Sequence, residues 1–377
     1  MAKNIFFFSL SLLVLVLIFL AAYNLIFKNN VNSPLADPSK KIAEGVGDAP
    51  FATGIAENVL NESVLGATMS DDNEIFYYSG DDQALKKANR DGKNKVILMS
   101  NLPGEATRVL WSAKKDRVLI LLKQRSGGTL WYSISLGNKT LVPLKPEIGR
   151  LAWDNFGEKI FYQYTDPVTN KRTMNSANAD GSDWKKLADL GAKDFFLTPV
   201  PQSNFVSFWA RSAIQYSSPL ETVSALGEGR RMVSTGFFGA DYSWSPDGEY
   251  VLASGSMTDK GNDFSLRLVT KNGEVRNLSL PTLISKTVWS DDSKTLYYAL
   301  PGSLPEGTLL PNDYFEKPLY TKDTFWKVDI TTGKKTRLIE LKENTMAFDS
   351  NDLFLPTSED ALYFTDRVSK KLYRIEL

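Results

Sequence analysis

A short motif recurs along the chain at a nearly constant spacing. Each clear copy ends an apolar stretch on a tryptophan, continues through a polar turn and begins a new apolar run, as in VLWSAKKDRVLILL, LAWDNFGEKIFYQY, YSWSPDGEYVLASG and TVWSDDSKTLYYAL. The four tryptophans are Trp111, Trp153, Trp244 and Trp289, so neighbouring copies lie 42 and 45 residues apart, and the gap of 91 residues leaves room for a degenerate copy near 198–211. A repeat of this length indicates a supersecondary unit that is used several times.

A second series of turns follows the first at the same spacing. These turns share a glycine, which follows Asp or Asn in three of the six, and the glycines are Gly92, Gly137, Gly181, Gly227, Gly273 and Gly333. Asp-Gly and Asn-Gly favour tight hairpins because both central residues can adopt positive φ. Each period therefore contains two hairpins, and four short strands in 40 to 45 residues are typical of a propeller blade.

The copies number seven, beginning near residues 66, 107, 149, 194, 241, 285 and 351. The seventh lacks an outer strand, since the chain ends at residue 377. The apolar stretch 55–65 precedes the first copy and has no partner of its own, so we expect it to supply the missing strand and close the ring, which leaves no edge exposed. The sequence thus predicts an all-β fold, a seven-bladed β-propeller of four-stranded antiparallel blades, over residues 56–377.

The N-terminal segment differs from the rest of the chain. Residues 5–27 are almost entirely apolar, and as a helix they would extend about 35 Å, enough to cross a hydrocarbon core of about 30 Å. Cleavage after Ala21 or Ala22 would place Phe19 or Leu20 at a position that requires a small residue. We therefore expect an uncleaved signal anchor over residues 1–28 and a Pro- and Gly-containing tether over 29–55, with the propeller outside the cytoplasm, in the periplasm or at the cell surface.

Composition excludes several functions. The chain has no His and no Cys, so a Ser-His-Asp triad, a cysteine nucleophile and a zinc-thiolate site are impossible. Lys plus Arg equals Asp plus Glu, 44 each, which gives no bulk attraction for nucleic acid. No P-loop and no G-x-S-x-G motif is present, and we expect no cofactor. A pair of carboxylates could still catalyse glycoside hydrolysis, but no pair stands out in the sequence.

The repeat residues themselves have a structural interpretation. We expect Trp111, Trp153, Trp244 and Trp289 to pack between neighbouring blades, and Asp247 and Gly248 to form a hairpin turn. The acidic stretches DDNE at 71–74 and SDD at 290–292 occupy this same turn position. Because they recur with the repeat, we expect no metal site there.

One copy departs from the spacing. Trp289 and Gly333 are 44 residues apart, about 16 more than in the other copies, and the extra length falls in residues 301–323. This loop contains four prolines together with Tyr314, Phe315 and Tyr320. Long loops are usually functional or disordered, and exposed aromatic side chains favour binding. We therefore treat the three aromatics as candidate partner-binding residues, the alternative being that the loop folds onto the propeller and buries them.

The segments WSPDGEYVLAS (244–254) and SANADGSDWKKL (176–187) resemble the TolB-type, WD40-like propeller repeat of bacterial envelope proteins, and the resemblance covers about residues 56–377. It implies a propeller whose loops at one face bind partners. The same repeat also resembles the propellers of prolyl oligopeptidases, although no hydrolase domain follows the repeats here. We therefore expect a membrane-tethered, non-enzymatic scaffold that binds a protein or an envelope component. The alternative is an envelope carbohydrate- or peptide-processing enzyme that uses carboxylates.

Overall fold

The computed structural model describes residues 53–54, 56–191, 194–210, 212–302, 304–341 and 347–377. The chain divides into two units, Met1–Ala49 and Pro50–Leu377, and all described residues belong to the second. The expected membrane span at 5–27 and most of the expected tether lie outside the described residues. Within the described ranges, no helix combines the length and apolar character needed to cross a membrane.

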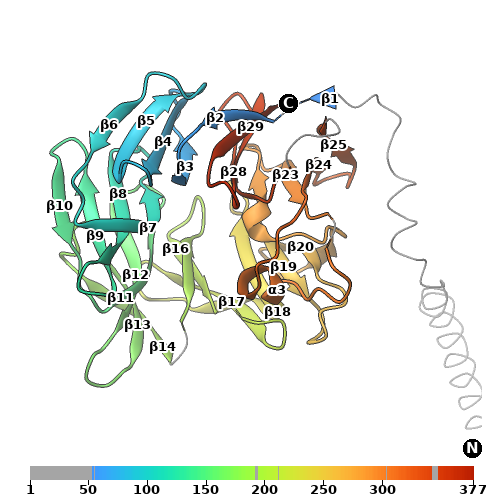
Figure 1. Ribbon diagram of the computed structural model, residues 1–377. Helices are drawn as coiled ribbons and strands as arrows, with labels where there is room; N and C mark the ends of the chain where they lie inside the picture. Colours follow the sequence, from blue (N-terminus) through green and yellow to red (C-terminus); the bar gives the residue numbers. More distant parts are fainter. Residues whose placement is uncertain (1–52, 55, 192–193, 211, 303, 342–346) are drawn as a thin grey trace, which may run out of the picture. The chain divides into compact units, whose positions relative to one another are not determined.

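Antiparallel strands make up most of the described chain, and they form sheets arranged one after another around a common centre (Figure 1). We number the sheets I to VII in chain order. Sheet I consists of β3 (Val64–Met69), β4 (Glu74–Ser79), β5 (Ala84–Asn89) and β6 (Val96–Met99). Sheet II consists of β7 (Gly104–Trp111), β8 (Arg117–Gln124), β9 (Thr129–Ser135) and β10 (Thr140–Pro143). Sheet III consists of β11 (Ile148–Trp153), β12 (Lys159–Thr165), β13 (Arg172–Asn178) and β14 (Lys185–Gly191).

Sheets IV and V are continuous because they share one long strand. Sheet IV consists of β15 (Phe196–Pro199), β16 (Phe205–Trp209), β17 (Ser217–Ser224) and the first part of β18 (Arg231–Trp244). Sheet V consists of the rest of β18 with β19 (Tyr250–Ser256), β20 (Ser265–Thr270) and β21 (Val275–Asn277). Up to Phe238, β18 pairs with β17, and from Phe238 onward it pairs with β19. A Cβ on Gly236 would lie 2.4 Å from the Ser218 carbonyl carbon, so this part of the strand requires glycine.

The remaining sheets bring the ends of the described chain together. Sheet VI consists of β22 (Thr287–Trp289), β23 (Thr295–Leu300), β24 (Thr324–Asp329) and β25 (Lys335–Arg337). Sheet VII consists of β27 (Ser350–Phe354), β28 (Ala361–Asp366), β29 (Leu372–Glu376) and, as its outer strand, β2 (Glu57–Leu60). Two short strands, β1 (Thr53–Gly54) and β26 (Glu340–Leu341), pair in parallel. The strand pairing expected for 55–65 is thus present over β2, where Glu57 lies opposite Arg374.

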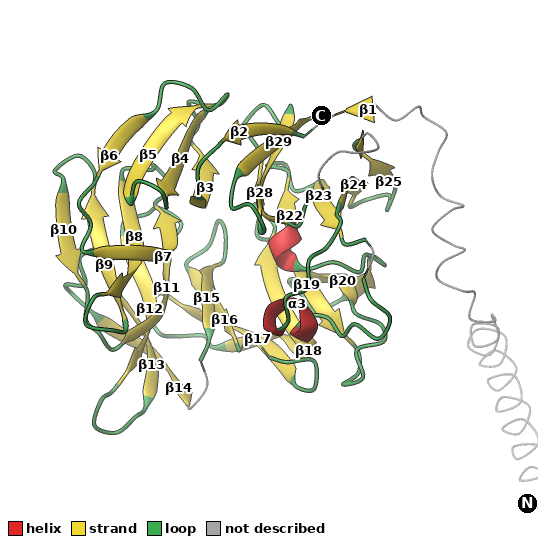
Figure 2. Cartoon of the chain, viewed as in Figure 1, coloured by secondary structure: helices red, strands yellow, loops and turns green. Residues whose placement is uncertain are grey.

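Apolar side chains fill the spaces between consecutive sheets. The second strands are apolar on both faces because each lies between two neighbouring sheets; all six residues of β28 are buried. A separate apolar cluster joins each sheet to the next, and one containing Leu60, Tyr77 and Tyr363 joins sheet VII to sheet I. The described residues contain only two short helical segments, the 3-10 turn η2 (Ile284–Lys286) and the helix α3 (Asn312–Glu316) (Figure 2).

The repeat tryptophans lie at the contacts between sheets. The indole nitrogens of Trp111 and Trp153 donate to the carbonyl oxygens of Gly66 and Leu110, at 2.8 and 2.9 Å, on the inner strand of the preceding sheet. Trp244 and Trp289 are buried at the equivalent positions, and Trp244 donates to Ser207 Oγ at 2.9 Å.

Asp247 and Gly248 form the turn after Trp244. Asp247 Oδ1 accepts a hydrogen bond from Ser245 Oγ at 2.5 Å. Gly248 adopts a φ of 71°, and a Cβ there would lie 2.5 Å from the Pro201 carbonyl oxygen, so the turn requires glycine.

Candidate functional site

The long loop between β23 and β24 packs partly against its own sheets. Tyr314 is 1% exposed and belongs to an apolar cluster with Ile214, Phe264 and Leu283, which come from sheets IV to VI and their connections. Phe315 is 47% and Tyr320 57% exposed. The three candidate residues therefore differ in their exposure to solvent. Tyr314 faces inward and is unavailable to a partner, whereas Phe315 and Tyr320 remain at the surface.

Tyr314 ends in a buried polar network, which we call the Lys286 network. Lys286 Nζ donates to Asp323 Oδ2 at 2.6 Å and to Asp349 Oδ1 at 2.8 Å, and the side chains of all three residues are 0% exposed. Tyr314 donates its hydroxyl to Asp349 Oδ1 at 2.7 Å, and Arg367 Nε donates to Asp349 Oδ2 at 2.8 Å. The network thus links the loop to sheets VI and VII.

Electrostatics in the Lys286 network favour the charged form of Asp349 and the neutral form of Tyr314. Burial alone would raise the pKa of Asp349, but the ammonium of Lys286 holds it below its ordinary value. Burial and the neighbouring Asp349 carboxylate raise the pKa of Tyr314. These groups neutralise one another inside the fold. Their arrangement serves to hold the loop, because none of the carboxylates is open to a ligand.

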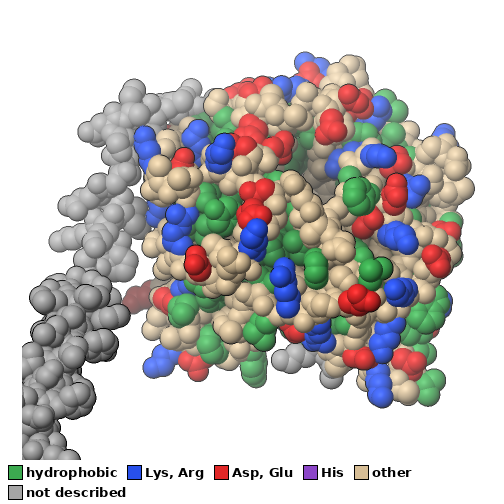
Figure 3. Space-filling model, turned by 180° about the vertical axis from the view of Figure 1, so that it is seen from behind, with side chains coloured by type: hydrophobic (Ala, Val, Ile, Leu, Met, Phe, Trp, Pro, Cys, Tyr) green, Lys and Arg blue, Asp and Glu red, His purple; other side chains and the backbone are tan. Residues whose placement is uncertain are grey.

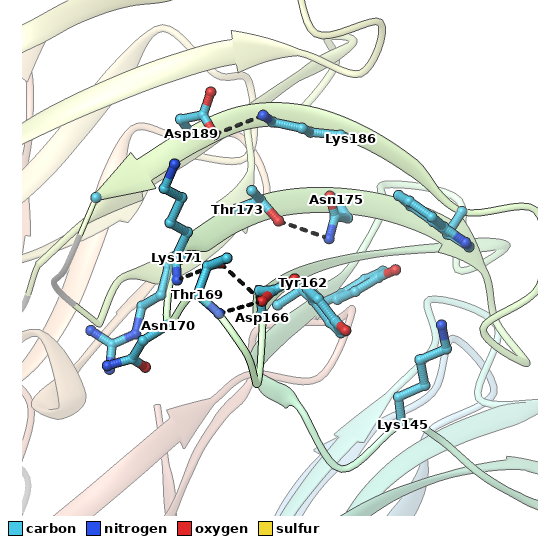
Figure 4. A pocket seen from close by; sticks show the side chains of 14 residues that line it. Lys145, Tyr162, Asp166, Thr169, Asn170, Lys171, Thr173, Asn175, Lys186 and Asp189 are labelled. Atoms are coloured by element: carbon cyan, nitrogen blue, oxygen red, sulfur yellow. Dashed lines mark hydrogen bonds and ion pairs between the residues drawn. The ribbon is translucent and has the colours of Figure 1, made fainter.

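A different set of polar groups lies open to solvent on sheet III. A groove of about 990 Å³ is lined by β12, β13 and β14, by the hairpin between β12 and β13, and by Lys145, which follows β10 (Figure 4). Tyr162 and Tyr164 of β12 lie opposite Asn175 and Thr173 of β13, so these four side chains share one face of sheet III. This groove, the sheet III groove, is the candidate functional site.

Four cationic side chains and an exposed indole surround the sheet III groove. The cations are Lys145, Lys171, Arg172 and Lys186. Trp184 precedes β14 and is 59% exposed. The Lys145 ammonium lies 5.9 Å from the centre of the Trp184 ring. In the close view, Lys145 extends from a separate segment toward the strands that carry Asn175 and Lys186 (Figure 4). The groove therefore combines strands of sheet III with the connection that leads from sheet II to sheet III.

Both carboxylates of the groove already have partners. Asp166 Oδ1 accepts hydrogen bonds from the backbone N–H of Thr169 at 2.7 Å and from the Thr169 hydroxyl at 2.9 Å. The Thr169 hydrogen bonds hold the pKa of Asp166 below its ordinary value. Asp189 pairs with Lys186 at 2.7 Å. The groove is thus lined by four cations and two carboxylates, with Lys186 paired to Asp189 and Arg172 lying 3.4 Å from Asp194.

Asn175 lies at the floor of the sheet III groove and is 2% exposed. Its Nδ2 donates to Thr173 Oγ1 at 3.2 Å, but its buried Oδ1 has no hydrogen-bond partner among the described residues. A buried polar atom without a partner is costly and calls for an explanation such as a ligand or an ordered water. Asn175 is therefore a candidate ligand contact.

Sequence reasoning did not find this groove. Its residues come from LVPLKP, from the hairpin DPVTNKR and from the repeat segment SANADGSDWKKL, which was interpreted only as a fold signature. Lys145 and Trp184 are 39 residues apart in the sequence and come together only in the folded protein. The one local signal was an exposed tryptophan next to two lysines in a predicted turn. Elsewhere, acidic and basic side chains are interspersed, as the rear face shows (Figure 3).

Comparisons with known proteins identify the fold. The structure is similar to an oligogalacturonate lyase in complex with manganese, with TM-score 0.61, 12% identity, and coverage of 87% of this chain and 96% of that one. A second oligogalacturonate lyase, from Vibrio parahaemolyticus, gives TM-score 0.58, 9% identity, and coverage of 85% and 90%. A streptogramin B lyase gives TM-score 0.54, 11% identity, and coverage of 85% and 96%. The chain has a β-propeller-like fold.

No family model matches the chain, and no curated protein matches its sequence. The resemblance to TolB-type repeats is thus supported only at the level of a propeller-like fold. The comparisons overturn the predicted non-enzymatic scaffold. That prediction gave weight to the lack of a catalytic domain after the propeller, yet this fold alone accounts for 90% and 96% of the two oligogalacturonate lyases. A propeller by itself can therefore be an enzyme, and the alternative prediction is better supported.

The first of these lyases binds manganese, so side chains of this chain that could hold the same ion are of interest. The sequence has no His or Cys. In the part of the chain that the structure describes, no three Asp or Glu side chains gather where they could hold a metal ion. Manganese prefers several oxygen or imidazole ligands. The described residues therefore do not fit a manganese ion, and we derive no step that involves one.

Proposed function

We propose that this protein is a carbohydrate-processing enzyme that binds acidic oligosaccharides in the sheet III groove. The observation that carries the proposal is the exposed Trp184 indole beside Lys145, in a groove that also contains Lys171, Arg172 and Lys186. The likeness of the whole fold to oligogalacturonate lyases supports the choice of substrate class.

The indole and the cationic side chains suit two different parts of an acidic sugar, the apolar face of its ring and its carboxylate. The apolar C–H face of a sugar ring packs on an indole, which offers a large rigid surface and a polar edge. A uronate carboxylate accepts charge-assisted hydrogen bonds from lysine or arginine, and arginine can bind it through two parallel bonds. Ligand sites commonly combine aromatic walls with a few polar groups that fix orientation.

The groove suits an elimination better than a hydrolysis. Hydrolysis by two carboxylates needs one free acid and one free base or nucleophile, and Asp166 and Asp189 are both engaged. In an elimination, a base removes the proton next to the uronate carboxylate. The electron pair forms a carbon–carbon double bond, the bond to the departing sugar oxygen breaks, and that oxygen takes a proton from water. Cations beside the carboxylate stabilise the charge that develops.

Tyr164 is the residue that we assign as the base. Tyrosine can act as a general base when its proton is removed, and Tyr164 lies on the same face of sheet III as Asn175 and is partly exposed. Its neighbour Tyr162 is only 4% exposed, and burial raises its pKa, so it is less suited to losing a proton.

We also infer that sheets I to VII form a closed seven-bladed ring and that residues 5–27 anchor it outside the cytoplasm. Closure is supported by the pairing of β2 with β29 and by the cluster between sheets VII and I. The anchor is supported by the apolar length of that segment.

The test of the proposed function is an assay of the full-length protein, purified in detergent, on oligogalacturonides. We expect the ultraviolet absorbance of an unsaturated product to increase, and a neutral oligosaccharide of equal length to give no signal. Tyr164→Phe should lower kcat by about a hundredfold or more, as expected for loss of a general base. Absence of product from every acidic oligosaccharide, together with absence of binding, would overturn the proposal.

A further inference from the structure

The sheet III groove has two ends that differ in what they offer a ligand. At one end, Lys171 and Arg172 lie at the hairpin between β12 and β13. At the other end, Trp184 lies at the turn before β14, with Lys145 of the neighbouring segment beside its ring. Along β13, the two ends are separated by the length of the strand, which is about 20 Å for a seven-residue strand. Lys186 and Asn175 lie between them and opposite each other.

This spacing of cations along one channel matches a chain that carries a carboxylate on every unit. A single sugar could contact only one end at a time. An oligomer can place one acidic unit near Arg172 and another on Trp184, with intermediate carboxylates near Lys186. Because the second contact becomes intramolecular once the first has formed, it adds affinity for long chains and none for short ones.

We propose that Trp184 and Lys145 form a distal subsite, which holds a non-reacting acidic sugar and makes the enzyme select longer oligomers. This inference rests on the proposed function and adds the location and the effect of one subsite. The sugar ring packs on the Trp184 indole, and its carboxylate pairs with the Lys145 ammonium. Trp184 precedes Lys185, which lies opposite Ser176, three residues along β13 from the Thr173 that lies opposite Tyr164. We therefore assign Trp184, with the Lys145 ammonium beside its ring, to substrate selection and not to the reaction.

Both residues of the pair lie in connections between strands, so their effect on binding is separable from folding. Trp184 is 59% exposed, so its removal leaves no buried cavity. The chain also provides matched controls on the other face of sheet III. Lys185 alternates with Lys186 along β14 and lines a different groove together with Phe156, which is 71% exposed. Lys185→Met and Phe156→Ala therefore remove a lysine and an aromatic side chain from this other groove, outside the proposed subsite.

The experiment compares digalacturonate with hexagalacturonate on the full-length protein, by steady-state kinetics and by calorimetric titration. Trp184→Ala should raise KM for the hexamer about tenfold, the loss expected for one aromatic contact, and Lys145→Met should act in the same direction. In both variants, kcat/KM for the hexamer should fall relative to kcat/KM for the dimer, whereas the two control variants should keep the parent's ratio. The hexamer affinity of the parent protein should fall with salt more steeply than that of Lys145→Met.

The outcomes separate the subsite from the proposed function. If the protein cleaves both substrates and neither Trp184→Ala nor Lys145→Met changes the hexamer KM, or if both change the dimer equally, the distal subsite is wrong and the activity stands. If the protein cleaves neither substrate but binds the hexamer, and Trp184→Ala abolishes that binding, the subsite stands and the reaction is wrong. If the hexamer does not bind at all, both are wrong.

Discussion

The Lys286 network and the sheet III groove contain the same kinds of side chain, but these side chains are buried in the network and exposed in the groove. Both combine lysine, arginine, tyrosine and aspartate. In the network, the side chains of Lys286, Asp323 and Asp349 are fully buried, and Lys286 pairs with both carboxylates. In the groove, the Lys186 and Asp189 side chains are 50% and 73% exposed. Burial decides the role: the buried groups fix the position of a loop, and the exposed groups remain available to a ligand.

Energetics explain why the difference matters. A buried ion pair is expensive to desolvate, so removal of one partner leaves a charge that the interior cannot solvate. An exposed pair is screened by water and contributes little to stability. Substitutions in the two regions should therefore give opposite profiles, with loss of stability in the network and loss of ligand binding in the groove.

The largest effect is expected for Lys286→Met. Loss of the ammonium leaves Asp323 buried without its cation, and we expect the free energy of unfolding to fall by about 3–5 kcal/mol. The matched control Lys186→Met in the groove should change it by less than about 1 kcal/mol. Chemical denaturation measures both.

A double variant sharpens this result. Lys286→Met with Asp323→Asn removes the uncompensated charge and should recover part of the lost stability. If Lys286→Met were as stable as the parent, the network would not hold the loop, and the contrast between the two regions would fail.

The second largest effect is expected on the pH dependence of stability, through Glu62 in the segment between β2 and β3. Glu62 lies in that segment and accepts hydrogen bonds from Lys86 at 2.7 Å, Lys95 at 2.7 Å and Tyr77 at 2.9 Å. Burial alone would raise its pKa, but these partners lower it from 4.5 to about 2. A carboxyl group whose pKa is lowered by folding stabilises the protein above its unfolded pKa. Its contribution should therefore be complete above about pH 4.5 and lost as the pH falls toward 2.

Thermal unfolding measured between neutral pH and pH 2 checks this expectation. Glu62→Gln should lower the melting temperature at neutral pH and flatten its decrease in acid. Asp166→Asn, on the exposed hairpin of the groove, is the control, and it should leave most of the acid dependence in place. An unchanged acid profile in Glu62→Gln would contradict the role of Glu62 in holding β2 beside sheet I, and with it one support of ring closure.

The smallest effect is expected for Tyr314→Phe. The hydroxyl donates to the buried Asp349 carboxylate, and its loss should cost about 1–3 kcal/mol because a buried acceptor loses a partner. Tyr320→Phe, at a tyrosine that is 57% exposed, should be nearly neutral. Equal stability losses in the two variants, measured by urea denaturation, would show that burial does not separate these two residues.

Much of the fold could be predicted because its signals are local. A hairpin turn depends on a few adjacent residues, such as Asp247 and Gly248, and the tryptophan repeat reports the period directly. The position of the long loop was also predictable, since an insertion shows as a change of spacing. Which of its aromatics face inward was not, because Asp349, the partner of Tyr314, is 35 residues away along the chain.

The site could not be predicted for the same physical reason. Lys145, Lys171 and Lys186 look like ordinary surface lysines until packing brings them to one groove. The scaffold prediction treated the absence of known catalytic motifs as absence of catalysis. A reaction that relies on lysine, arginine and tyrosine carries no compact motif, so a chain without His or Cys gives few sequence signals of it.

The shared strand β18 has a consequence for how this protein can be cut and rejoined. Between sheets I and II, the chain passes through a loop, where new termini can be introduced without breaking a strand. Between sheets IV and V, the same fourteen residues serve both sheets, so no such loop exists. Circular permutants and split fragments that open between sheets I and II should reassemble, whereas those that open within β18 should not. Sheets IV and V therefore form one unit that cannot be divided between two fragments.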